Sequence, residues 1–354
     1  MSKTSRGNFL EDFRLGQILR HATPRTVTCG DVALYTALYG SRFAVQSAAS
    51  FAGSVGLGRD GHAPLDDLLV FHVVFGKSVP DISLNAVANL GYAGGRFGEP
   101  VYPGDTLDAV SEVIGIKENS NRQTGVVYVR TTGRTQRGAV AVEYVRWVMV
   151  RKRDPEAVLA ETRVPELPGA VAAADLIVPA GLDLAGYDDV LAGSPYRWDD
   201  YQPGEKIDHV DGVTIEEAEH MMATRLWQNT ARVHFNQFSE SQGRFGRRLI
   251  YGGHVLSLAR ALSFNGLGNA FRLAAINGGR HANPTFAGDT LFAWSEVLER
   301  IELPGRTDLG ALRLRLVATR NQPCDAFPLL AANGRDTDPA VVLDFDYTVL
   351  MPRR

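Results

Sequence analysis

This sequence has few cysteines, no long apolar run and almost no excess of either charge. Its 354 residues include two cysteines, Cys29 and Cys324. Two are too few for a disulfide-stabilised scaffold or a four-thiolate metal site. No stretch approaches the roughly 18 uncharged apolar residues that cross a membrane, so no transmembrane span is expected. The 37 basic and 40 acidic residues nearly cancel, and no basic stripe marks a nucleic-acid surface.

The rest of the composition is typical of a globular protein. Hydrophobic residues make up 45% and charged residues 22% of the chain, which argues against bulk disorder. The length predicts about two domains with a large core. Polar residues follow Met1 where a secretory signal would have an apolar segment, so we expect a cytoplasmic location.

Two halves of the chain carry the same motifs in the same order. Residues 12–17 (Asp-Phe-Arg-Leu-Gly-Gln) resemble 200–205 (Asp-Tyr-Gln-Pro-Gly-Glu), and the Gly-Asp-Thr-Leu at 104–107 recurs at 288–291. Such ordered matches predict two copies of one domain. We place the copies at 1–153 and 196–354. The Pro/Ala-rich segment 154–195 is expected to connect them, because its repeated prolines would interrupt helices and sheets.

The second copy predicts an α+β fold. Thr214–Glu217 fits a capping box and predicts a helix that starts there. Residues 249–262 are apolar nearly all round, as in a helix buried on most sides. Strand patterns follow at 291–297, 311–316 and 340–350. One buried helix followed by several antiparallel strands describes a sheet wrapped around a helix.

These segments resemble the MaoC-like dehydratases, or (R)-specific enoyl-CoA hydratases, over nearly the whole chain apart from the connector. The two Gly-Asp-Thr-Leu segments look like that family's strand-turn signature. The resemblance implies a double hotdog, in which two tandem hotdog repeats join their sheets edge to edge. It also implies a CoA thioester substrate, a homodimer, and chemistry without a metal or redox cofactor. Whole-chain order is most similar to mesaconyl-CoA (2-methylfumaryl-CoA) hydratases, which interconvert mesaconyl-CoA and β-methylmalyl-CoA.

The family's loop pattern, Gly-Asp-x-Asn-Pro-x-His, supplies a catalytic Asp and His. In the second copy Asn229 and His234 stand at these two positions. The first copy has Ser41 and Gln46, which cannot exchange protons near neutral pH, so we expect this copy to be degenerate. By resemblance, His234 moves protons, while Asn229 positions the water or the imidazole.

A glycine that opens the family's central helix donates its amide to the thioester carbonyl. The resemblance assigns this role to Gly253, with Tyr251 and Gly252 as neighbouring substrate-binding residues. Val73 is the expected counterpart of Gly253 in the first copy. Arg232 replaces the proline of the loop pattern and is expected to bind the substrate's free carboxylate.

Each assignment has a structural alternative. His234 could be a structural histidine, Asn229 a turn residue and Gly253 a glycine required by close packing. Arg232 could be an ordinary surface residue, and the basic run 151–153 could be a solvated strand end or a contact to CoA phosphates. His72 and His254 are interpreted as satisfied core residues.

The function also has alternatives. The chain could hydrate a straight-chain enoyl-CoA or 3-methylfumaryl-CoA. It could instead be an acyl-CoA thioesterase, or an acyl-CoA-binding protein without catalysis.

Overall fold

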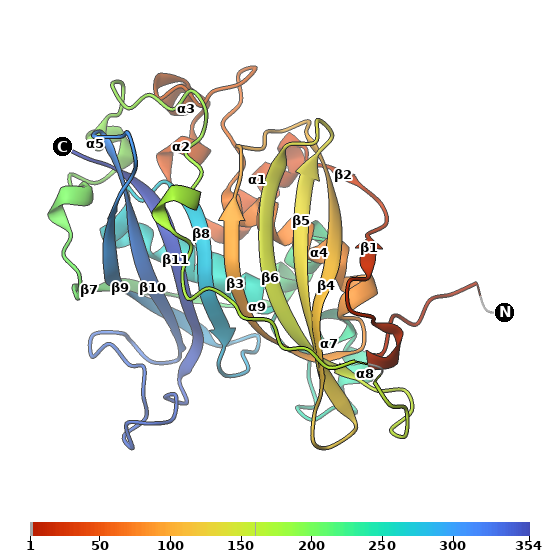
Figure 1. Ribbon diagram of the computed structural model, residues 1–354. Coiled ribbons are helices and arrows are strands. Elements are labelled where there is room, and N and C mark those ends of the chain that lie inside the picture. Colours follow the sequence, from red (N-terminus) through yellow and green to blue (C-terminus); the bar gives the residue numbers. More distant parts are fainter. Residues whose placement is uncertain (1–2, 160) are drawn as a thin grey trace.

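The computed structural model describes residues 3–159 and 161–354, and one antiparallel sheet dominates it (Figure 1). Within these residues the sheet has 11 strands in the order β1-β4-β5-β6-β3-β8-β11-β10-β9-β7, and β2 pairs with β4. The strands are β1 (Ile18–Arg20), β2 (Arg25–Thr26), β3 (Ala86–Phe97), β4 (Thr106–Glu118), β5 (Thr124–Thr135), β6 (Val140–Arg151), β7 (Lys206–Thr214), β8 (Arg272–His281), β9 (Thr290–Glu302), β10 (Leu309–Arg320) and β11 (Val341–Pro352).

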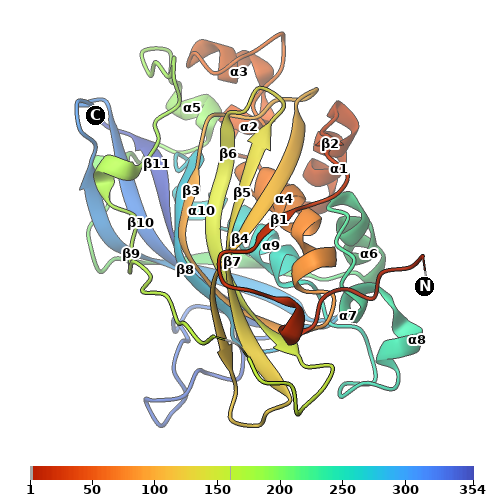
Figure 2. The same cartoon turned by 45° about the vertical axis from the view of Figure 1, so that its right-hand side comes forward.

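The two central helices lie against one face of this sheet (Figure 2). Helix α4 packs on β4, β5 and β6, and α9 packs on β7, β9, β10 and β11. The α-helices are α1 (Cys29–Tyr39), α2 (Ala44–Ser47), α3 (Ala49–Ser54), α4 (Asp67–Ile82), α5 (Asp189–Ala192), α6 (Glu217–Leu226), α7 (Arg232–Phe235), α8 (Gln237–Glu240), α9 (Gly252–Leu262) and α10 (Phe264–Leu267). Short 3₁₀ helices are η1 (Leu10–Asp12), η2 (Ala173–Asp175) and η3 (Trp198–Asp200).

The halves join where β3 pairs with β8, with Tyr92 opposite Gly279 and Arg96 opposite Ala275. The strand order on one side of this junction mirrors the order on the other. Each half therefore covers the exposed edge that the other would leave. The predicted α+β double hotdog is confirmed.

A contact between the central helices marks the pseudo-twofold axis that relates the halves. His72 Nε2 lies 3.0 Å from Ser257 Oγ, and both side chains are buried. Helix α4 begins at Asp67 and α9 at Gly252. His72 and Ser257 therefore occupy the same position in the sequence of their own helices. Equivalent positions thus meet where the helices cross.

The helix predicted to start at Thr214 begins later, so that prediction was wrong. Thr214 ends β7, and its Oγ1 lies 2.8 Å from Thr290 Oγ1 on the neighbouring strand. Helix α6 follows Glu216, which gives it no side-chain cap. The capping-box pattern gave a wrong helix start because the Thr214 hydroxyl bonds to a neighbouring strand and not to the first turn of a helix.

The segment between the repeats crosses the outer face of the sheet (Figure 1). The backbones of Arg163 and Ile116 exchange two hydrogen bonds of 2.8 Å. Asn277 Oδ1 accepts a hydrogen bond of 2.9 Å from the N–H of Val171. These contacts fasten the segment along much of its length, which suits a packed crossover better than a free tether.

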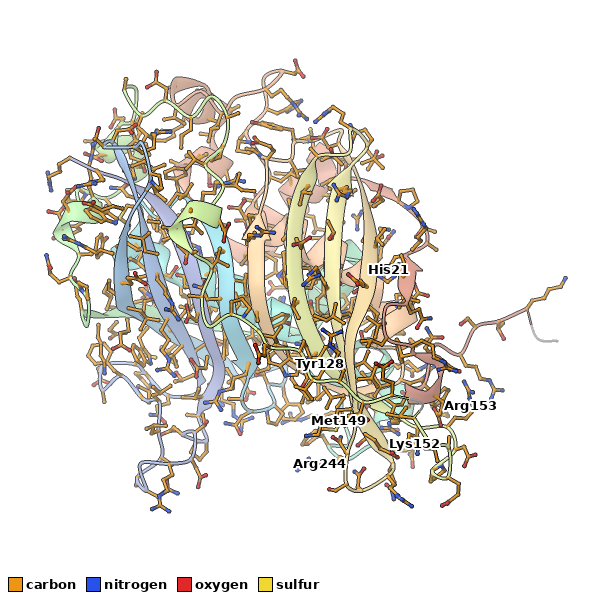
Figure 3. All side chains as sticks on the ribbon, viewed as in Figure 1. His21, Tyr128, Met149, Lys152, Arg153 and Arg244 are labelled. Carbon is orange, nitrogen blue, oxygen red and sulfur yellow. The ribbon has the colours of Figure 1, made fainter. Side chains whose placement is uncertain are left out.

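The basic run at the end of β6 has partners within the protein. Lys152 Nζ lies 2.7 Å from Glu118 Oε1, and Arg153 lies 2.6 Å from Asp12 Oδ2 (Figure 3). Arg153 also lies over the ring of Phe9. Lys152 is buried, so the run is not simply the solvated strand end considered above, and both ion pairs lie within the protein.

Candidate active site

The loop predicted to be catalytic turns sharply after α6. Gln228 has a φ of 53°, and its counterpart in the first half, Gly40, has a φ of 59°. Asn229 follows with 5% of its surface exposed, and its Oδ1 accepts a hydrogen bond of 3.0 Å from the N–H of Ala231. This bond stabilises the turn into α7. The structural role considered for Asn229 is thus present, and its side-chain NH2 is the group left for another partner.

The His234 ring is held by one nitrogen and leaves the other available. Its Nδ1 lies 3.0 Å from the carbonyl oxygen of Leu249, which can only accept, so Nδ1 carries a proton. Burial lowers the pKa of His234 to about 4, and the Leu249 carbonyl offsets this only in part. The imidazole is therefore neutral near pH 7, and Nε2 has a lone pair for a proton.

Helix α9 begins beside this ring. Tyr251 is its N-cap residue, and the centroid of the Tyr251 ring lies 5.3 Å from that of His234. Gly252 and Gly253 form the first turn, where backbone N–H groups have no partner inside the helix. The Gly253 amide is therefore a free donor close to the candidate base, which is what a thioester oxygen acquiring charge would need.

Crowding explains why this turn contains glycine. A Cβ on Gly253 would lie 2.4 Å from Tyr251 Cε1 and 2.5 Å from His72 Cε1, and one on Gly252 would lie 2.4 Å from the ring of His281. Only glycine fits both positions without movement of these rings. The close-packing alternative is thus present too, because the missing side chain lets the rings of Tyr251 and His72 approach the backbone.

Further imidazoles surround the start of α9. The His220 ring centroid lies 6.2 Å from that of His234 and 5.6 Å from that of His254. Burial lowers the pKa of His220 to about 2, with help from the other two imidazoles. Burial likewise lowers the pKa of His254 to about 3 and that of His281 to about 4. All four rings are neutral at physiological pH.

Several of these rings have only one hydrogen-bonded nitrogen. Tyr39 Oη lies 2.8 Å from His254 Nδ1, but His254 Nε2 has no partner among the described residues. His281 Nδ1 and Trp227 Nε1 are also buried without a partner in that part of the chain. The interpretation of His254 as a satisfied core residue is therefore only half right. Unpaired buried polar atoms are rare, and they favour a site that a ligand or water completes.

Sequence reasoning missed the contributions of His220, Trp227 and His72. The His72 ring centroid lies 4.4 Å from that of Trp227 and 5.7 Å from that of Tyr251, although His72 belongs to the first repeat. No spacing of residues in the sequence indicates that His72 contacts Trp227 and Tyr251. The two-fold relation between the repeats could have predicted this contact, because such a relation brings the central helices together.

The matching loop of the first repeat is tied into the structure. Ser41 Oγ donates to Asp66 Oδ2 at 3.1 Å, and Gln46 Nε2 donates to the carbonyl oxygen of Phe271 at 2.7 Å. Asp66 caps α4 by accepting from the N–H of Leu68 at 2.9 Å. Ser41 and Gln46 thus each donate a hydrogen bond within the fold, although Gln46 Oε1 is buried without a partner among the described residues.

The expected counterpart of Gly253 was misplaced. Helix α4 begins at Asp67 and α9 at Gly252, so Leu68, and not Val73, is the second residue of its helix as Gly253 is. The error came from aligning the helices without knowing where each begins. Leu68 is fully buried, so the first repeat still lacks a glycine at this point.

Arg232 is the first residue of α7, and its side chain is exposed. No hydrogen bond or ion pair of this side chain is present within the described residues. Its assignment as the carboxylate-binding residue stays a prediction. Water largely screens the charge of an exposed arginine, which weakens its attraction for a carboxylate.

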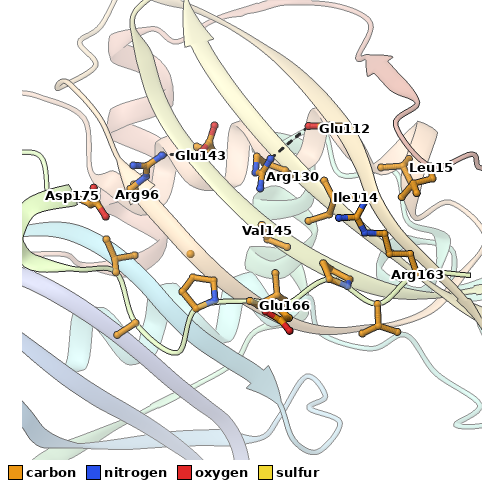
Figure 4. Close-up of a pocket in the computed structure, with 18 of the residues that line it drawn as sticks. Leu15, Arg96, Glu112, Ile114, Arg130, Glu143, Val145, Arg163, Glu166 and Asp175 are labelled. Carbon is orange, nitrogen blue, oxygen red and sulfur yellow. Dashed lines mark hydrogen bonds and ion pairs between the residues drawn. The ribbon is translucent and has the colours of Figure 1, made fainter.

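Two hollows in the described part of the chain lie away from His234. The larger, about 860 Å³, lies between the outer face of the N-terminal strands and the segment that contains Arg163 and Pro165 (Figure 4). Ion pairs line it, Arg96 with Glu143 at 3.1 Å and Arg130 with Glu112 at 3.6 Å. A second hollow of about 220 Å³ is lined by residues that include Tyr39 and Leu258. Neither includes His234.

Two kinds of feature are absent from the described residues. No helix there is long and apolar enough to cross a membrane. No group of three or more His, Cys, Asp or Glu side chains there is arranged to hold a metal ion.

Comparison with known proteins gives full-length matches. The family model for mesaconyl-CoA hydratase matches residues 2–328. A β-methylmalyl-CoA dehydratase of Chloroflexus aurantiacus is 67% identical over 353 residues, covering 100% of this chain and 99% of the relative. A mesaconyl-CoA hydratase of Cereibacter sphaeroides is 59% identical over 353 residues, covering 99% of this chain and 100% of the relative.

Solved structures agree with these matches. The crystal structure of a MaoC domain protein dehydratase from Chloroflexus aurantiacus is 66% identical, covers 100% of both chains and superposes with a TM-score of 0.97. A Mycobacterium tuberculosis protein described as a double hotdog has a TM-score of 0.75 at 24% identity, over 98% of this chain and 99% of that one. The second likeness supports the fold alone.

Proposed function

Because the chain belongs to the mesaconyl-CoA hydratase family, we propose that it adds water reversibly across the C=C bond of mesaconyl-CoA to give β-methylmalyl-CoA. It is thus a carbon–oxygen lyase. The observation that carries this conclusion is the 67% identity over the full chain with a β-methylmalyl-CoA dehydratase.

The proposed chemistry starts at the imidazole of His234. Its Nε2 takes a proton from water while the water oxygen bonds to the β-carbon, the carbon that also bears the free carboxylate. The electrons of the C=C bond move toward the thioester, whose oxygen gains negative charge. His234 then returns the proton to the α-carbon, which bears the methyl group, and becomes neutral again. The reverse sequence removes water from β-methylmalyl-CoA.

The Gly253 amide is proposed to stabilise the charged thioester oxygen. Its free N–H lies in the first turn of α9, where the helix dipole also favours negative charge. One such donor is worth roughly 3 kcal/mol of transition-state stabilisation in other oxyanion holes. Tyr251 and Gly252 are proposed to line the thioester end of the substrate. Asn229 is proposed to position the water or the imidazole through its side-chain NH2.

We assign the chemistry to the C-terminal repeat. The first repeat has Ser41 and Gln46 in place of Asn229 and His234, and both form hydrogen bonds within the fold. The N-terminal repeat is proposed to serve as a partner that packs His72 against the start of α9. The proposed boundaries remain 1–153 and 196–354, with 154–195 between them.

The test is incubation of the purified protein with mesaconyl-CoA. Hydration removes the absorbance of the conjugated enoyl thioester while free thiol stays constant. Release of thiol would instead support a thioesterase, and saturable binding without either change would support a non-catalytic binding protein. Crotonyl-CoA in parallel reports whether a straight-chain enoyl thioester is preferred.

Two further proposals concern assembly and location. Resemblance to MaoC-like dehydratases supports a homodimer, which light scattering coupled to gel filtration would test. A cytoplasmic location is proposed as well and would be tested by cell fractionation.

A further inference from the structure

A buried arginine in the N-terminal repeat has no acidic partner. The side chain of Arg146, in the middle of β6, has 0% of its surface exposed. Its Nη2 donates to Ser78 Oγ at 2.9 Å and to Ser83 Oγ at 3.1 Å. Its Nε and Nη1 have no hydrogen-bond partner, and none of the ion pairs found in the described residues includes it. A guanidinium carries five N–H donors, so most of its donors are unused.

The surroundings of Arg146 offer rings in place of a counter-ion. Its guanidinium carbon lies 4.2 Å from the centroid of the Phe75 ring. The titratable groups close enough to act on it are the phenols of Tyr144, Tyr92 and Tyr251, and burial raises the pKa of all three, so none is ionised at neutral pH. Burying a charge without a partner costs several kcal/mol. An anion from outside the chain would therefore stabilise Arg146.

The C-terminal repeat provides an internal comparison. In β6, Arg146 lies opposite Val129 and Tyr92. In β11, Tyr347 lies opposite Leu314 and Ile276. These two residues are the counterparts of Val129 and Tyr92 in the second repeat. Tyr347 therefore occupies the place of Arg146 in the second repeat.

The C-terminal repeat also buries a guanidinium beside this position, but the arginine belongs to helix α9 and not to the strand. Arg260 of α9 is 3% exposed and lies 5.9 Å from the Tyr347 ring. Unlike Arg146, Arg260 is close enough to Asp66 and Asp67 to interact with their carboxylates. One repeat thus neutralises its buried guanidinium from within the protein, and the other leaves it uncompensated.

Arg146 and the candidate base are connected through aromatic rings, and Tyr251 is close enough to Arg146 to interact with it electrostatically. The Tyr251 ring centroid lies 5.3 Å from that of His234 and 5.6 Å from that of Phe75, the ring that Arg146 covers. The hydroxyl of Tyr251, which is 4% exposed, has no partner among the described residues. Tyr251 and Phe75 thus form a continuous series of contacts from His234 to the guanidinium of Arg146.

We propose that Arg146 binds the free carboxylate of the substrate and is a specificity-determining residue that the N-terminal repeat supplies to the site in the C-terminal repeat. The inference rests on the proposed function, because mesaconyl-CoA carries one carboxylate that is not esterified to CoA. That carboxylate sits on the carbon that water attacks, so fixing it also orients the reacting bond. The buried Arg146 is better suited to this role than the exposed Arg232, because a buried ion pair is not screened by solvent.

The test compares two thioesters that differ only at the carboxylate. 2-Methylcrotonyl-CoA has the carbon skeleton and double-bond geometry of mesaconyl-CoA with a methyl group in place of the carboxylate. Arg146→Met should lower kcat/KM for mesaconyl-CoA at least ~100-fold, the scale of removing one partner of a buried charge pair. Its kcat/KM for 2-methylcrotonyl-CoA, or the Ki if this thioester only inhibits, should change less than ~3-fold.

Two variants keep the result interpretable if Arg146→Met folds poorly. Arg146→Lys keeps the charge but loses the planar fork, so it should show a smaller loss that is again confined to mesaconyl-CoA. Arg146→Ala leaves space for free guanidinium at millimolar concentration, which should restore hydration of mesaconyl-CoA only. Arg130→Met, on the outer face of β5 beside Glu112, is the matched surface control and should leave both thioesters unaffected.

Three outcomes would overturn the inference. One is an equal loss on both thioesters in Arg146→Met and Arg146→Lys, which would mean a structural role. Another is wild-type use of mesaconyl-CoA by Arg146→Met. A third is a mesaconyl-selective loss in Arg232→Ala that is absent from Arg146→Met. Failure of the proposed function is distinct, since there the wild-type protein would not hydrate mesaconyl-CoA at all.

Discussion

The Nε2 atom of His220 accepts a hydrogen bond of 2.9 Å from the backbone N–H of Tyr251. His220 lies on α6 and Tyr251 caps α9, so this bond connects the catalytic loop's helix to the helix that presents the Gly253 amide. Because burial keeps His220 neutral, its Nε2 stays an acceptor at physiological pH. The imidazole works here as a fixed support for backbone geometry.

Replacing His220 tests this support. His220→Leu leaves a buried N–H at Tyr251 without an acceptor, a loss of about 1–3 kcal/mol. It should lower kcat more than it changes KM, because the start of α9 loses its alignment with His234. His220→Gln can offer an amide oxygen and should recover part of kcat. Urea unfolding and steady-state kinetics measure both effects, and identical kinetics for the two variants would argue against a positioning role.

His234→Asn separates the role of His234 in the fold from its role in proton transfer. The asparagine amide can still donate to the Leu249 carbonyl, as Nδ1 of His234 does, but it has no basic nitrogen. We expect a nearly unchanged melting temperature and a fall in kcat of roughly 10²–10⁴-fold, the usual contribution of a general base. Activity within ~5-fold of wild type would remove His234 from the mechanism.

Gly253→Ala tests the crowded first turn of α9. The added methyl would overlap the rings of Tyr251 and His72, at a cost of about 1–3 kcal/mol in stability with a displaced amide. Gly53→Ala in α3 is the matched control, since a Cβ there meets nothing within 4 Å. The control should be neutral or stabilising by up to ~1 kcal/mol. Unfolding curves and kcat for the pair would show whether the loss is specific to this turn.

Stability should fall steeply in mild acid. Burial is the main cause that lowers the pKa of six imidazoles below their usual value: His72 to about 3, His209 to about 4, His220 to about 2, His234 to about 4, His254 to about 3 and His281 to about 4. The unfolded chain therefore binds more protons than the folded chain between about pH 6.5 and pH 4. The stabilisation is complete above pH 6.5 and is lost as the pH falls through that window.

One buried carboxyl acts in the opposite direction. Burial raises the pKa of Asp67 to about 6, against the pull of Arg272, so the folded state gains a proton there before the unfolded state does. One or two such groups offset only part of the imidazole effect. The net slope should be on the order of several kcal/mol per pH unit near pH 5. Melting temperatures from pH 8 to pH 5 measure it, and a flat profile would contradict the neutral, buried state of these rings.

The sequence predicted the architecture well because duplication leaves ordered motifs. The Gly-Asp-Thr-Leu segments mark the same strand start in both repeats, at β4 and β9. The apolar run that ends at Leu262 was recognised as the central helix, although it begins at Gly252 and not at 249. The starts of helices were predicted less well. Thr214 begins a capping-box pattern, but its hydroxyl forms a hydrogen bond with Thr290 instead of capping a helix.

The site was only partly predictable. The loop pattern identified Asn229 and His234, since they lie at fixed spacing in one segment. Arg146 and His72 could not be found in this way. His72 reaches the start of α9 from the other repeat, and what distinguishes Arg146 is a missing partner, which only a folded structure reveals.

The junction of β3 with β8 within one polypeptide has an evolutionary consequence. In an assembly of two identical single-repeat chains, every substitution would appear on both sides of the axis. Here one side can lose its imidazole and gain an unmatched cation while the other keeps its working groups. The fusion thus allows an asymmetric catalyst to develop from a symmetric ancestor.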